Sequence, residues 1–386
     1  MDSKGRSDTS VADESKATRL TIPFSDLGIG DVEIVGGKNA SLGEMISALA
    51  SEGIRVPDGF ATTSDAYWLF IDHNNIRSEL SKLLDSLDTE MTNLSEVADE
   101  CRKLVRNGDL PGELADQITD AYLKLGGSKH IDVAVRSSAT AEDLPGASFA
   151  GLHESFLNVR GVNNLLTSCR ECFSSLFTER AIKYRHDKGF DHMKIALSVG
   201  VQRMVRSDLS SSGIAFTIDP DSGFRDTVVI NGTWGLGENI VQGKVDPDEF
   251  ILFKPALSNG VRSLISSSLG KKQESLIYTD SDGTGSGTVN IETPICKQKK
   301  FVLSKDELTL LGTWCLKIED HYKMPMDIEW AKDGETDEMF IIQARPETVH
   351  AIEDDPHLIR MYQIRSEGNT LCEGIGLVNG IAMGRA

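Results

Sequence analysis

The alternation of apolar and polar residues predicts helices and buried strands in the first half of the chain. Residues 21–35 indicate a short strand and turn, and a helix follows over "GGKNASLGEMISALASEG", with Gly53 as its stop. The pattern from about 74 to 125 is helical and is broken at "NGDLPGE". The apolar run "HIDVAV" predicts a buried strand, after which helical periodicity resumes between about 162 and 189. We therefore expect a mixed α+β fold.

From residue 194 to 252 the spacing of the apolar residues changes from the helical period to the shorter period that is typical of β-strands. "KIALSVGVQRMV", "SGIAFTIDP", "DTVVINGTWG" and "DEFILFK" are strand-like segments separated by Gly, Asp and Pro. Residues 257–290 are rich in Ser and Gly and predict exposed loops around a hairpin. A helix begins at Ser304, which forms a capping box with Glu307, and ends before Pro325. "MDIEWA" and "MFIIQA" then predict an antiparallel hairpin.

These patterns divide the 386 residues into four parts, and a chain of this length has room for two or three domains. We expect a flexible polar tail over residues 1–20 and an N-terminal lobe over 21–193. A C-terminal lobe covers 194–350, and residues 351–386 read as a linker and the start of a further domain.

Composition and charge exclude several classes of protein. Hydrophobic residues make up 39% of the chain, and no apolar run approaches the ~20 residues that a membrane helix needs. A net charge of −19 disfavours nucleic acid and anionic membranes as partners, because both repel an acidic surface. The N-terminus lacks the apolar core of a signal peptide, and the scattered cysteines do not form a disulfide framework, which favours a reduced, cytoplasmic location. We interpret the CxxC of Cys169 and Cys172, which falls in a helical pattern, as packing rather than metal or redox chemistry.

Two basic residues are candidates for holding a phosphate. Lys38 follows a double glycine at the start of a helix, where free backbone N–H groups and the helix dipole favour an anion. The segment is not a Walker A loop, because Val32 and Asn39 occupy positions that need Gly and Ser or Thr. Arg136 leaves a buried strand and is followed by hydroxyl residues, so its planar fork suits phosphate oxygens. The alternatives are a solvated Lys38 and an Arg136 paired with Glu142 or Asp143.

The loop after Arg136 is built from very small residues. "PGASFAG", residues 145–151, includes Ser148 and Gly151 and allows a backbone to approach a ligand closely. Such a loop can close over phosphates as a lid. An ordinary surface turn with a core Phe149 is the alternative.

The predicted hairpin carries candidate metal ligands. Asp327 and Glu329 share one face of the first strand, and Gln343 and Arg345 share one face of the second. If these faces coincide, two carboxylates, an amide oxygen and a guanidinium converge, which suits Mg²⁺ bridging nucleotide phosphates. The alternative is a cross-strand ion pair between Glu329 and Arg345 that serves stability alone.

Two further segments bear on a nucleotide. "VQRMV" ends a strand and contains Gln202, Met204 and Val205, whose backbone can meet an adenine edge, although a core methionine is the plainer interpretation. "GTWGLGENIVQGK" does not complete GxGxxG, because Ile240 stands where the third glycine belongs, so a Rossmann site is disfavoured. Glu238 and its glycines more plausibly border the nucleotide.

Nine segments in order resemble the N-terminal ATP-binding portion of phosphoenolpyruvate synthase, a family related to pyruvate phosphate dikinase and the rifampin phosphotransferases. The resemblance covers about residues 22–350. The segments are "VGGKNASLGEM", "VPDGFATT", "VRSSATAEDLPGASFAG", "GVQRMVRSD", "SGIAFTID", "WGLGE", "PDEF", "PMDIEWA" and "QARPET".

The resemblance implies an ATP-grasp-like fold of two lobes that enclose ATP, with residues 145–151 as the lid. It implies that Lys38, Arg136 and Arg345 contact phosphates and are catalytic through charge, and that residues 202–205 frame the adenine. It also implies that Mg²⁺ is held by Glu329 and Gln343 with Asp327 nearby. In such dikinases a histidine on a swivelling domain attacks the β-phosphate, releases AMP, loses the γ-phosphate to water and carries phosphate to the acceptor.

The chain departs from the family because the Gly-Gly-x-Thr-Cys-His type of motif that carries this histidine is absent from the sequence. We therefore expect a phosphohistidine-bearing partner. The first hypothesis is a separate subunit, as in phenylphosphate synthase with phenol as acceptor, which the initial Met and an end inside a predicted strand favour. The second is an N-terminal fragment of phosphoenolpyruvate synthase with pyruvate as acceptor. The third is a nucleotide-binding regulatory module without chemistry.

Overall fold

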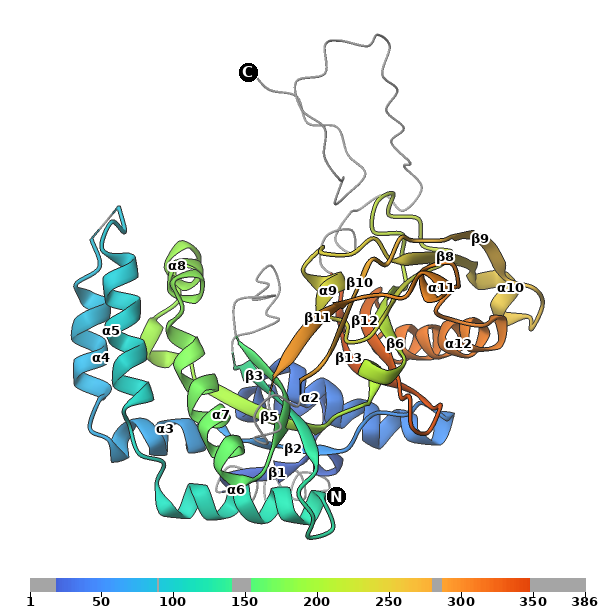
Figure 1. Cartoon of the computed structure of the whole chain (residues 1–386). Coiled ribbons are helices and arrows are strands. Elements are labelled where there is room, and N and C mark those ends of the chain that lie inside the picture. The colour runs from blue at the N-terminus through green and yellow to red at the C-terminus, as the bar shows by residue number, and fades with distance from the viewer. Residues whose placement is uncertain (1–18, 89, 141–153, 280–286, 348–386) are drawn as a thin grey trace, which may run out of the picture. The chain divides into compact units, whose positions relative to one another are not determined.

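The computed structural model describes residues 19–88, 90–140, 154–279 and 287–347. Contacts within the chain group these residues into two units (Figure 1). The first unit holds the described residues up to Val205, together with those of Ile277–Val289 and Phe340–Ala344. The second holds Arg206–Leu276, Asn290–Met339 and the described residues from Arg345 onward.

The first unit is built on a five-stranded sheet with the order β1-β2-β5-β3-β4, and its four strand pairs are antiparallel. Its strands are β1 (Thr21–Pro23), β2 (Gly59–Thr62), β3 (Asp132–Ala139), β4 (Ser155–Arg160) and β5 (Leu197–Arg203). β3 and β5 are the long inner pair of strands, and most of their residues are buried, although β3 also carries the polar Arg136, Ser137 and Ser138.

Within the described part of this unit, seven α-helices accompany the sheet. The buried Cys169, Cys172 and Phe173 of α7 share one core with Val135 and Val201 of the central strands. Figure 1 shows α4, α5 and α8 side by side, and α5 contacts both of the others. The helices are α2 (Val32–Leu49), α3 (Ser64–His73), α4 (Arg77–Asp85), α5 (Leu94–Arg106), α6 (Gly112–Leu125), α7 (Val162–Ser174) and α8 (Glu179–Lys188).

The second unit is built on a six-stranded sheet with the order β13-β12-β6-β7-β8-β9, of which Phe340–Ala344 of β13 are grouped with the first unit. A separate two-stranded sheet joins β10 (Glu274–Tyr278) to β11 (Thr288–Glu292), whose residues are divided between the two units. The strands of the larger sheet are β6 (Ser211–Phe216), β7 (Thr227–Trp234), β8 (Asp248–Phe253), β9 (Leu264–Ser268), β12 (Met326–Lys332) and β13 (Met339–Pro346).

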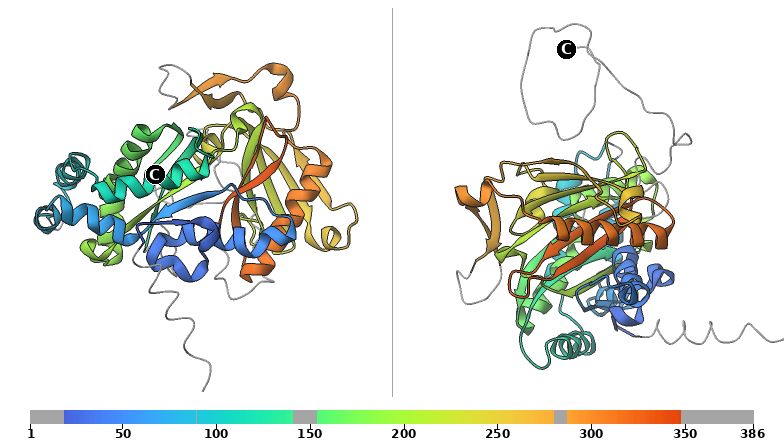
Figure 2. Two further views of the ribbon diagram at one scale, coloured as in Figure 1. Left: turned by 90° about the horizontal axis from the view of Figure 1, so that it is seen from below. Right: turned by 90° about the vertical axis from the view of Figure 1, so that its right-hand side faces the viewer.

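α12 (Lys305–Tyr322) lies along one face of the six-stranded sheet, as the right-hand view of Figure 2 shows. It buries an apolar stripe that includes Leu311, Trp314 and Ile318. Its N-cap is Ser304, which accepts from the N–H of Glu307, while the Glu307 carboxylate accepts from the N–H of Ser304. The predicted capping box is therefore confirmed. The remaining helices are α9 (Glu238–Val241), α10 (Lys254–Ser258) and α11 (Ile295–Gln298).

The structure differs from the sequence-based expectations at three places. β5 pairs with β2 and β3, so the contacts keep the chain with the first unit as far as Val205 instead of dividing it at 193. Leu20, which we assigned to the flexible tail, is buried in the core and accepts a hydrogen bond from the N–H of Thr63. β9 is a strand of the large sheet within the region expected to be loops and a hairpin.

Some expectations lie outside the described residues, namely those on residues 1–18, on the whole small-residue loop 145–151 and on 348–386. None of the helices in the described ranges is both long and apolar enough to span a membrane.

Candidate functional site

A glycine brings α2 into backbone contact with β3. Gly36 has a φ of +75° and interrupts the helical conformation, so the regular helix that carries Lys38 begins after it. A β-carbon at Gly36 would overlap the Ser138 hydroxyl and lie 2.6 Å from the Ser138 carbonyl oxygen. Glycine is required here both for the backbone angle and for the close approach. The double glycine therefore sets Lys38 in the first turn of a helix pressed against the end of β3.

A buried polar network fixes this contact. The Asn39 N–H donates to the Ser138 hydroxyl at 3.4 Å, and Asn39 Nδ2 donates to the Ser198 hydroxyl at 2.9 Å. Ser198 in turn donates to the Thr62 carbonyl oxygen at 2.5 Å. A β-carbon at Gly200 would overlap Asn39 Oδ1. The network links α2 to β3, β5 and β2, and each partner is nearly inaccessible to solvent.

Lys38 and Arg136 lie on the same side of the sheet. Ser138, which Asn39 contacts, and Arg136 are two residues apart on β3 and share one face. Lys38 Nζ lies 3.5 Å from the carbonyl oxygen of Ser137, at the long limit of a hydrogen bond. Arg136 is half-buried opposite Gly200, which has no side chain to cover it. The structure thus places both candidate cations on one side of the sheet, and their phosphate-binding role stays a prediction.

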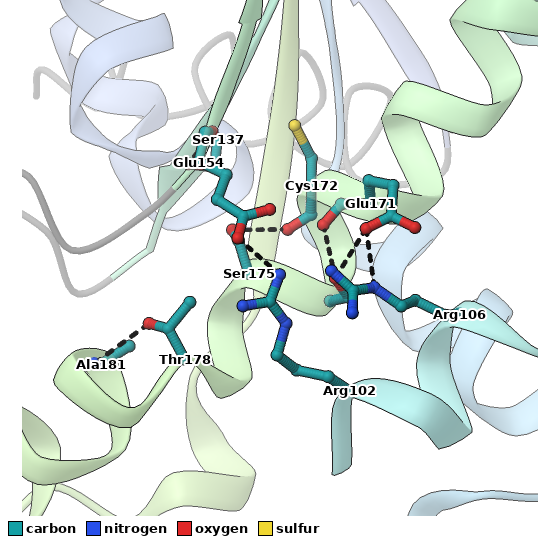
Figure 3. A network of polar contacts seen from close by, with 10 residues as sticks. Arg102, Arg106, Ser137, Glu154, Glu171, Cys172, Ser175, Thr178 and Ala181 are labelled. Carbon is teal, nitrogen blue, oxygen red and sulfur yellow. Dashed lines mark hydrogen bonds and ion pairs between the residues drawn. The ribbon is translucent and has the colours of Figure 1, made fainter. Parts of the chain in front are cut away.

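Two arginine–glutamate pairs lie beside β3. Arg102 Nη2 donates to Glu154 Oε1 at 2.5 Å, and Arg106 of α5 donates from Nε to Glu171 Oε2 of α7 at 2.8 Å. The Ser137 hydroxyl donates to the Glu154 carbonyl oxygen at 3.3 Å. Figure 3 shows these contacts among α5, α7 and the start of β4. Glu154 therefore links Ser137, the residue after Arg136, to α5.

The segment predicted to meet the adenine is the end of β5. Gln202 is buried, and its Nε2 donates to the Pro57 carbonyl oxygen at 3.4 Å. The Met204 N–H donates to the Asp132 carbonyl oxygen at 3.0 Å. That N–H is already occupied, so an adenine edge would meet the Met204 carbonyl oxygen and the Val205 N–H instead.

In the second unit, the hairpin of β12 and β13 forms an ion pair between Asp327 and Arg345. Arg345 Nε and Nη2 both donate to Asp327 Oδ2, at 2.8 and 2.7 Å. Burial raises the pKa of Asp327, and the Arg345 guanidinium opposes that effect. The cross-strand alternative named Glu329 as the partner of Arg345, whereas this contact is with Asp327. Asp327 and Glu329 alternate with buried apolar residues, as expected for one face of β12.

The predicted Mg²⁺ ligands fit in part. Glu329 is half-buried on the face of β12 that carries Asp327, and Gln343 is buried on β13, two residues before Arg345. A carboxylate and an amide oxygen are donors that Mg²⁺ accepts, with water and phosphate completing its shell. Asp327 fits less well, because Arg345 already engages one of its oxygens. Within the described ranges, no group of three or more His, Cys, Asp or Glu side chains is arranged to hold a metal.

Two predicted site residues, Ser148 and Gly151, lie outside the described residues. The acids considered as alternative partners of Arg136, Glu142 and Asp143, also lie there.

The CxxC pair is unsuited to redox chemistry. Cys169 and Cys172 are both buried free thiols. Burial raises the pKa of Cys169 to about 12 and also raises that of Cys172, so neither forms the reactive thiolate near neutral pH. They fill the core beneath β3, as the packing interpretation expected.

Comparison with known proteins identifies the class. Residues 32–366 match the family described as "Pyruvate phosphate dikinase, AMP/ATP-binding domain", and the chain belongs to that family. The predicted resemblance to the ATP-binding portion of phosphoenolpyruvate synthase, and with it the assignment as a dikinase ATP-binding component, is confirmed at this level.

Curated relatives show the same relationship along most of the chain. It is 46% identical over 390 residues to a phosphoenolpyruvate synthase of Aquifex aeolicus, which covers 97% of this chain and 45% of the relative. It is 45% identical over 393 residues to the enzyme of that name from Synechocystis, covering 98% of this chain and 47% of the relative. The match to the Escherichia coli enzyme is 43% over 367 residues, or 95% of this chain and 46% of the relative. The chain spans about half the length of these relatives.

Proposed function

We propose that this chain supplies the ATP-binding half of a dikinase reaction. A histidine on a phosphohistidine-bearing domain attacks the β-phosphorus of ATP, the bond to the α-phosphate oxygen breaks, and AMP leaves. Water then removes the γ-phosphate as inorganic phosphate, and the phosphohistidine passes its phosphoryl group to the acceptor. The observation that carries this proposal is the placement of Lys38 and Arg136 on one face of the first unit's sheet, in a chain of this family.

Phosphoryl transfer needs positioning and charge neutralisation more than covalent participation by the protein. We assign Lys38 and Arg136 to the phosphate oxygens, where a point charge on a flexible stem and a planar fork are complementary. Arg345 would add a third cation, with Asp327 fixing the orientation of its guanidinium. These charges oppose the negative charge that develops on the leaving AMP oxygen.

Glu329 and Gln343 would hold Mg²⁺, and Asp327 would orient Arg345 beside it. When bound, Mg²⁺ supplies neutralisation of the phosphate charge and helps to fix the phosphate geometry. The protein's own contribution is to set one carboxylate and one amide oxygen on neighbouring strands. Both side chains are at least half-buried, which limits their motion.

The adenine would be recognised by residues 202–205. The Met204 carbonyl oxygen and the Val205 N–H can meet a purine edge, while Gln202 is held through Pro57 beneath them. We propose that both units contribute to ATP binding in an ATP-grasp-like arrangement, supported by the distribution of these residues over two sheet-based units. A lid over residues 145–151 and a cytoplasmic location remain predictions.

Pyruvate is the acceptor that the relatives favour, because those reported above are named phosphoenolpyruvate synthases. Phenol, the acceptor we first favoured from the sequence, has no support among them. The regulatory alternative is disfavoured because the chain retains two phosphate-binding cations and an Mg²⁺-type donor pair.

The deciding experiment mixes this chain with the C-terminal remainder of the phosphoenolpyruvate synthase from Aquifex aeolicus and then adds [β-³²P]ATP. We expect label on a histidine of the added part, with AMP and inorganic phosphate as products. Unlabelled pyruvate should then remove the label through the added part. Binding of ATP without any AMP would favour the regulatory module.

A further inference from the structure

The chain passes from the first unit to the second between Val205 and Arg206. Residues just before this point are bound within the first unit. The Arg203 N–H donates to the Asp58 carbonyl oxygen at 2.9 Å, and the Met204 N–H donates to Asp132 at 3.0 Å. The backbone is therefore fixed by the first unit as far as Met204.

Arg206 begins a dense set of contacts within the second unit. Its guanidinium reaches Asp208 with two hydrogen bonds, Nε to Oδ1 and Nη2 to Oδ2, both at 2.9 Å. Its Nη1 donates to Glu335 Oε1 at 3.0 Å. The bidentate geometry orients the side chain as well as neutralising it, because the planar fork fits the carboxylate in one arrangement only. The Asp208 side chain is 4% exposed, so solvent screens this pair weakly.

The backbone of Arg206 also forms hydrogen bonds within the second unit. Its N–H donates to Asp333 Oδ2 at 3.0 Å, and its carbonyl oxygen accepts from the Gly334 N–H at 3.0 Å. Asp333 also accepts from the N–H groups of Glu335 and Thr336. Burial acts to raise the pKa of Asp333, but these donors outweigh it and hold the pKa below its usual value. Asp333 is thus an ionised anchor between β12 and β13.

Only Val205 lies between the last residue bound to the first unit and the first residue bound to the second. We infer that Arg206 is a positioning residue for nucleotide recognition, which orients the Met204 carbonyl oxygen and the Val205 N–H through its contacts with Asp208, Asp333 and Gly334. This inference rests on the proposed adenine site. A supporting residue of this kind acts by holding the contact groups in place before the ligand arrives.

The test measures how the full 386-residue chain binds two ligands that share a triphosphate, of which only one carries the adenosine group. Isothermal titration with Mg²⁺ present compares ATP with inorganic tripolyphosphate. For Arg206→Met we expect ATP affinity to fall about tenfold, the loss of one well-placed hydrogen-bonding group, with tripolyphosphate affinity unchanged. Arg77→Met is the matched control, because Arg77 of α4 also forms a bidentate pair, with Asp72, outside the proposed adenine segment, and it should change neither affinity.

Each outcome separates the alternatives. Equal loss for both ligands would make Arg206 a general structural residue and overturn the inference, as would retention of both affinities. If the unaltered chain binds ATP no better than tripolyphosphate, the adenine site fails and the inference fails with it. If it prefers ATP and Arg206→Met keeps that preference, the inference alone fails.

A milder variant covers the case in which Arg206→Met does not fold. Arg206→Lys keeps the positive charge beside Asp208 but cannot form the fork. We expect an intermediate loss of about threefold for ATP alone, since a point charge orients less well than a bidentate pair. An Arg206→Lys chain with the ATP affinity of the unaltered protein would contradict the role.

Discussion

Arg345 directs both its Nε and its Nη2 at one oxygen of Asp327, at 2.8 and 2.7 Å. The Asp327 side chain is 14% exposed, so removing its charge would leave a partly buried guanidinium without its anion. The pair therefore both stabilises the hairpin and sets the direction of the third cation in the proposed site.

Asp327→Asn should lower the free energy of unfolding by about 1–2 kcal/mol. The amide keeps the size of the carboxylate, so the change isolates its charge. Urea denaturation at neutral pH measures the difference. Asp320→Asn is the control, because Asp320 forms an ion pair with Lys323 but is 82% exposed, so solvent screens the pair and the substitution should change stability much less. Equal effects of the two substitutions would mean that the buried pair contributes no more than an exposed one.

Gly200→Ala should shift the position of Lys38 indirectly, through Asn39. The added methyl group would overlap Asn39 Oδ1 and separate Asn39 from Ser198, so we expect a loss of about 1–3 kcal/mol in unfolding free energy. ATP affinity should fall as well, because α2 moves away from β3.

Gly112→Ala is the matched control for this change. Gly112 begins α6 and has no neighbouring atom that an added β-carbon would meet, so stability should be unchanged or slightly higher. Calorimetric melting and ATP titration on both variants complete the comparison. A Gly200→Ala chain as stable as Gly112→Ala would show that the network tolerates repacking.

The local features of this fold could be read from the sequence, and the long-range ones could not. The capping box at Ser304 and the left-handed stop at Gly53 depend on a few adjacent residues, and both are present. The Asn39–Ser198 contact joins residues 159 apart. It depends on the pairing of β3 with β5, which no local pattern specifies. Asn39 entered the sequence argument only as a mismatch to a Walker A loop.

The hairpin shows the same limit within the candidate site. Alternation places Asp327 and Glu329 on one face of β12, but it does not say which of them lies nearer to Arg345. That choice depends on strand register, which the hydrogen bond from the Glu347 N–H to the Pro325 carbonyl oxygen helps to fix. The alternation of residues therefore predicts the faces of the candidate site residues, whereas the Asp327–Arg345 pair required the structure.

His192 should make stability depend on pH. Burial, with Arg185 beside it, lowers its pKa from 6.5 to about 4, and its Nδ1 accepts from Arg185 Nε at 3.0 Å. In the unfolded chain the His192 imidazole binds a proton near pH 6.5, whereas in the folded chain it does so only near pH 4. The contribution of the neutral His192 to the free energy of unfolding is therefore fully present above about pH 6.5. It is lost as the pH falls from there towards 4.

His192→Asn should weaken that dependence, because an amide oxygen can still accept from Arg185 but does not titrate near this pH. Between pH 7 and pH 5 we expect the unaltered chain to lose about 1 kcal/mol more than the variant, after allowing for solvent screening. Urea unfolding at the two pH values measures this difference. Identical pH slopes would show that His192 is not the titrating group.

Cysteine reactivity should follow burial. Cys296 is exposed, whereas burial raises the pKa of both Cys169 and Cys315 to about 12. We expect iodoacetamide to label Cys296 within minutes in the native protein and the other two only after unfolding. Peptide mass spectrometry resolves the sites, and labelling in urea provides the control. Native labelling of Cys169 would contradict the packing interpretation of the CxxC pair.

Arg136 offers the most direct test of the chemistry. Arg136→Ala should slow transfer of label from [β-³²P]ATP to the added histidine domain by about 10²- to 10³-fold, because one preorganised charge is lost. The transfer rate of Arg136→Lys should lie between those of Arg136→Ala and the unaltered chain, since the charge is kept and the planar fork is lost.

Arg160→Ala is the control: Arg160 ends β4 in the same sheet, but its side chain is 58% exposed and its partner is Asp132. Single-turnover measurements remove differences in product release, and circular dichroism checks that each variant is folded. Arg136 is half-buried rather than fully enclosed, so its loss should leave the fold intact. A folded Arg136→Ala chain that transfers label at the rate of Arg160→Ala would remove Arg136 from the site.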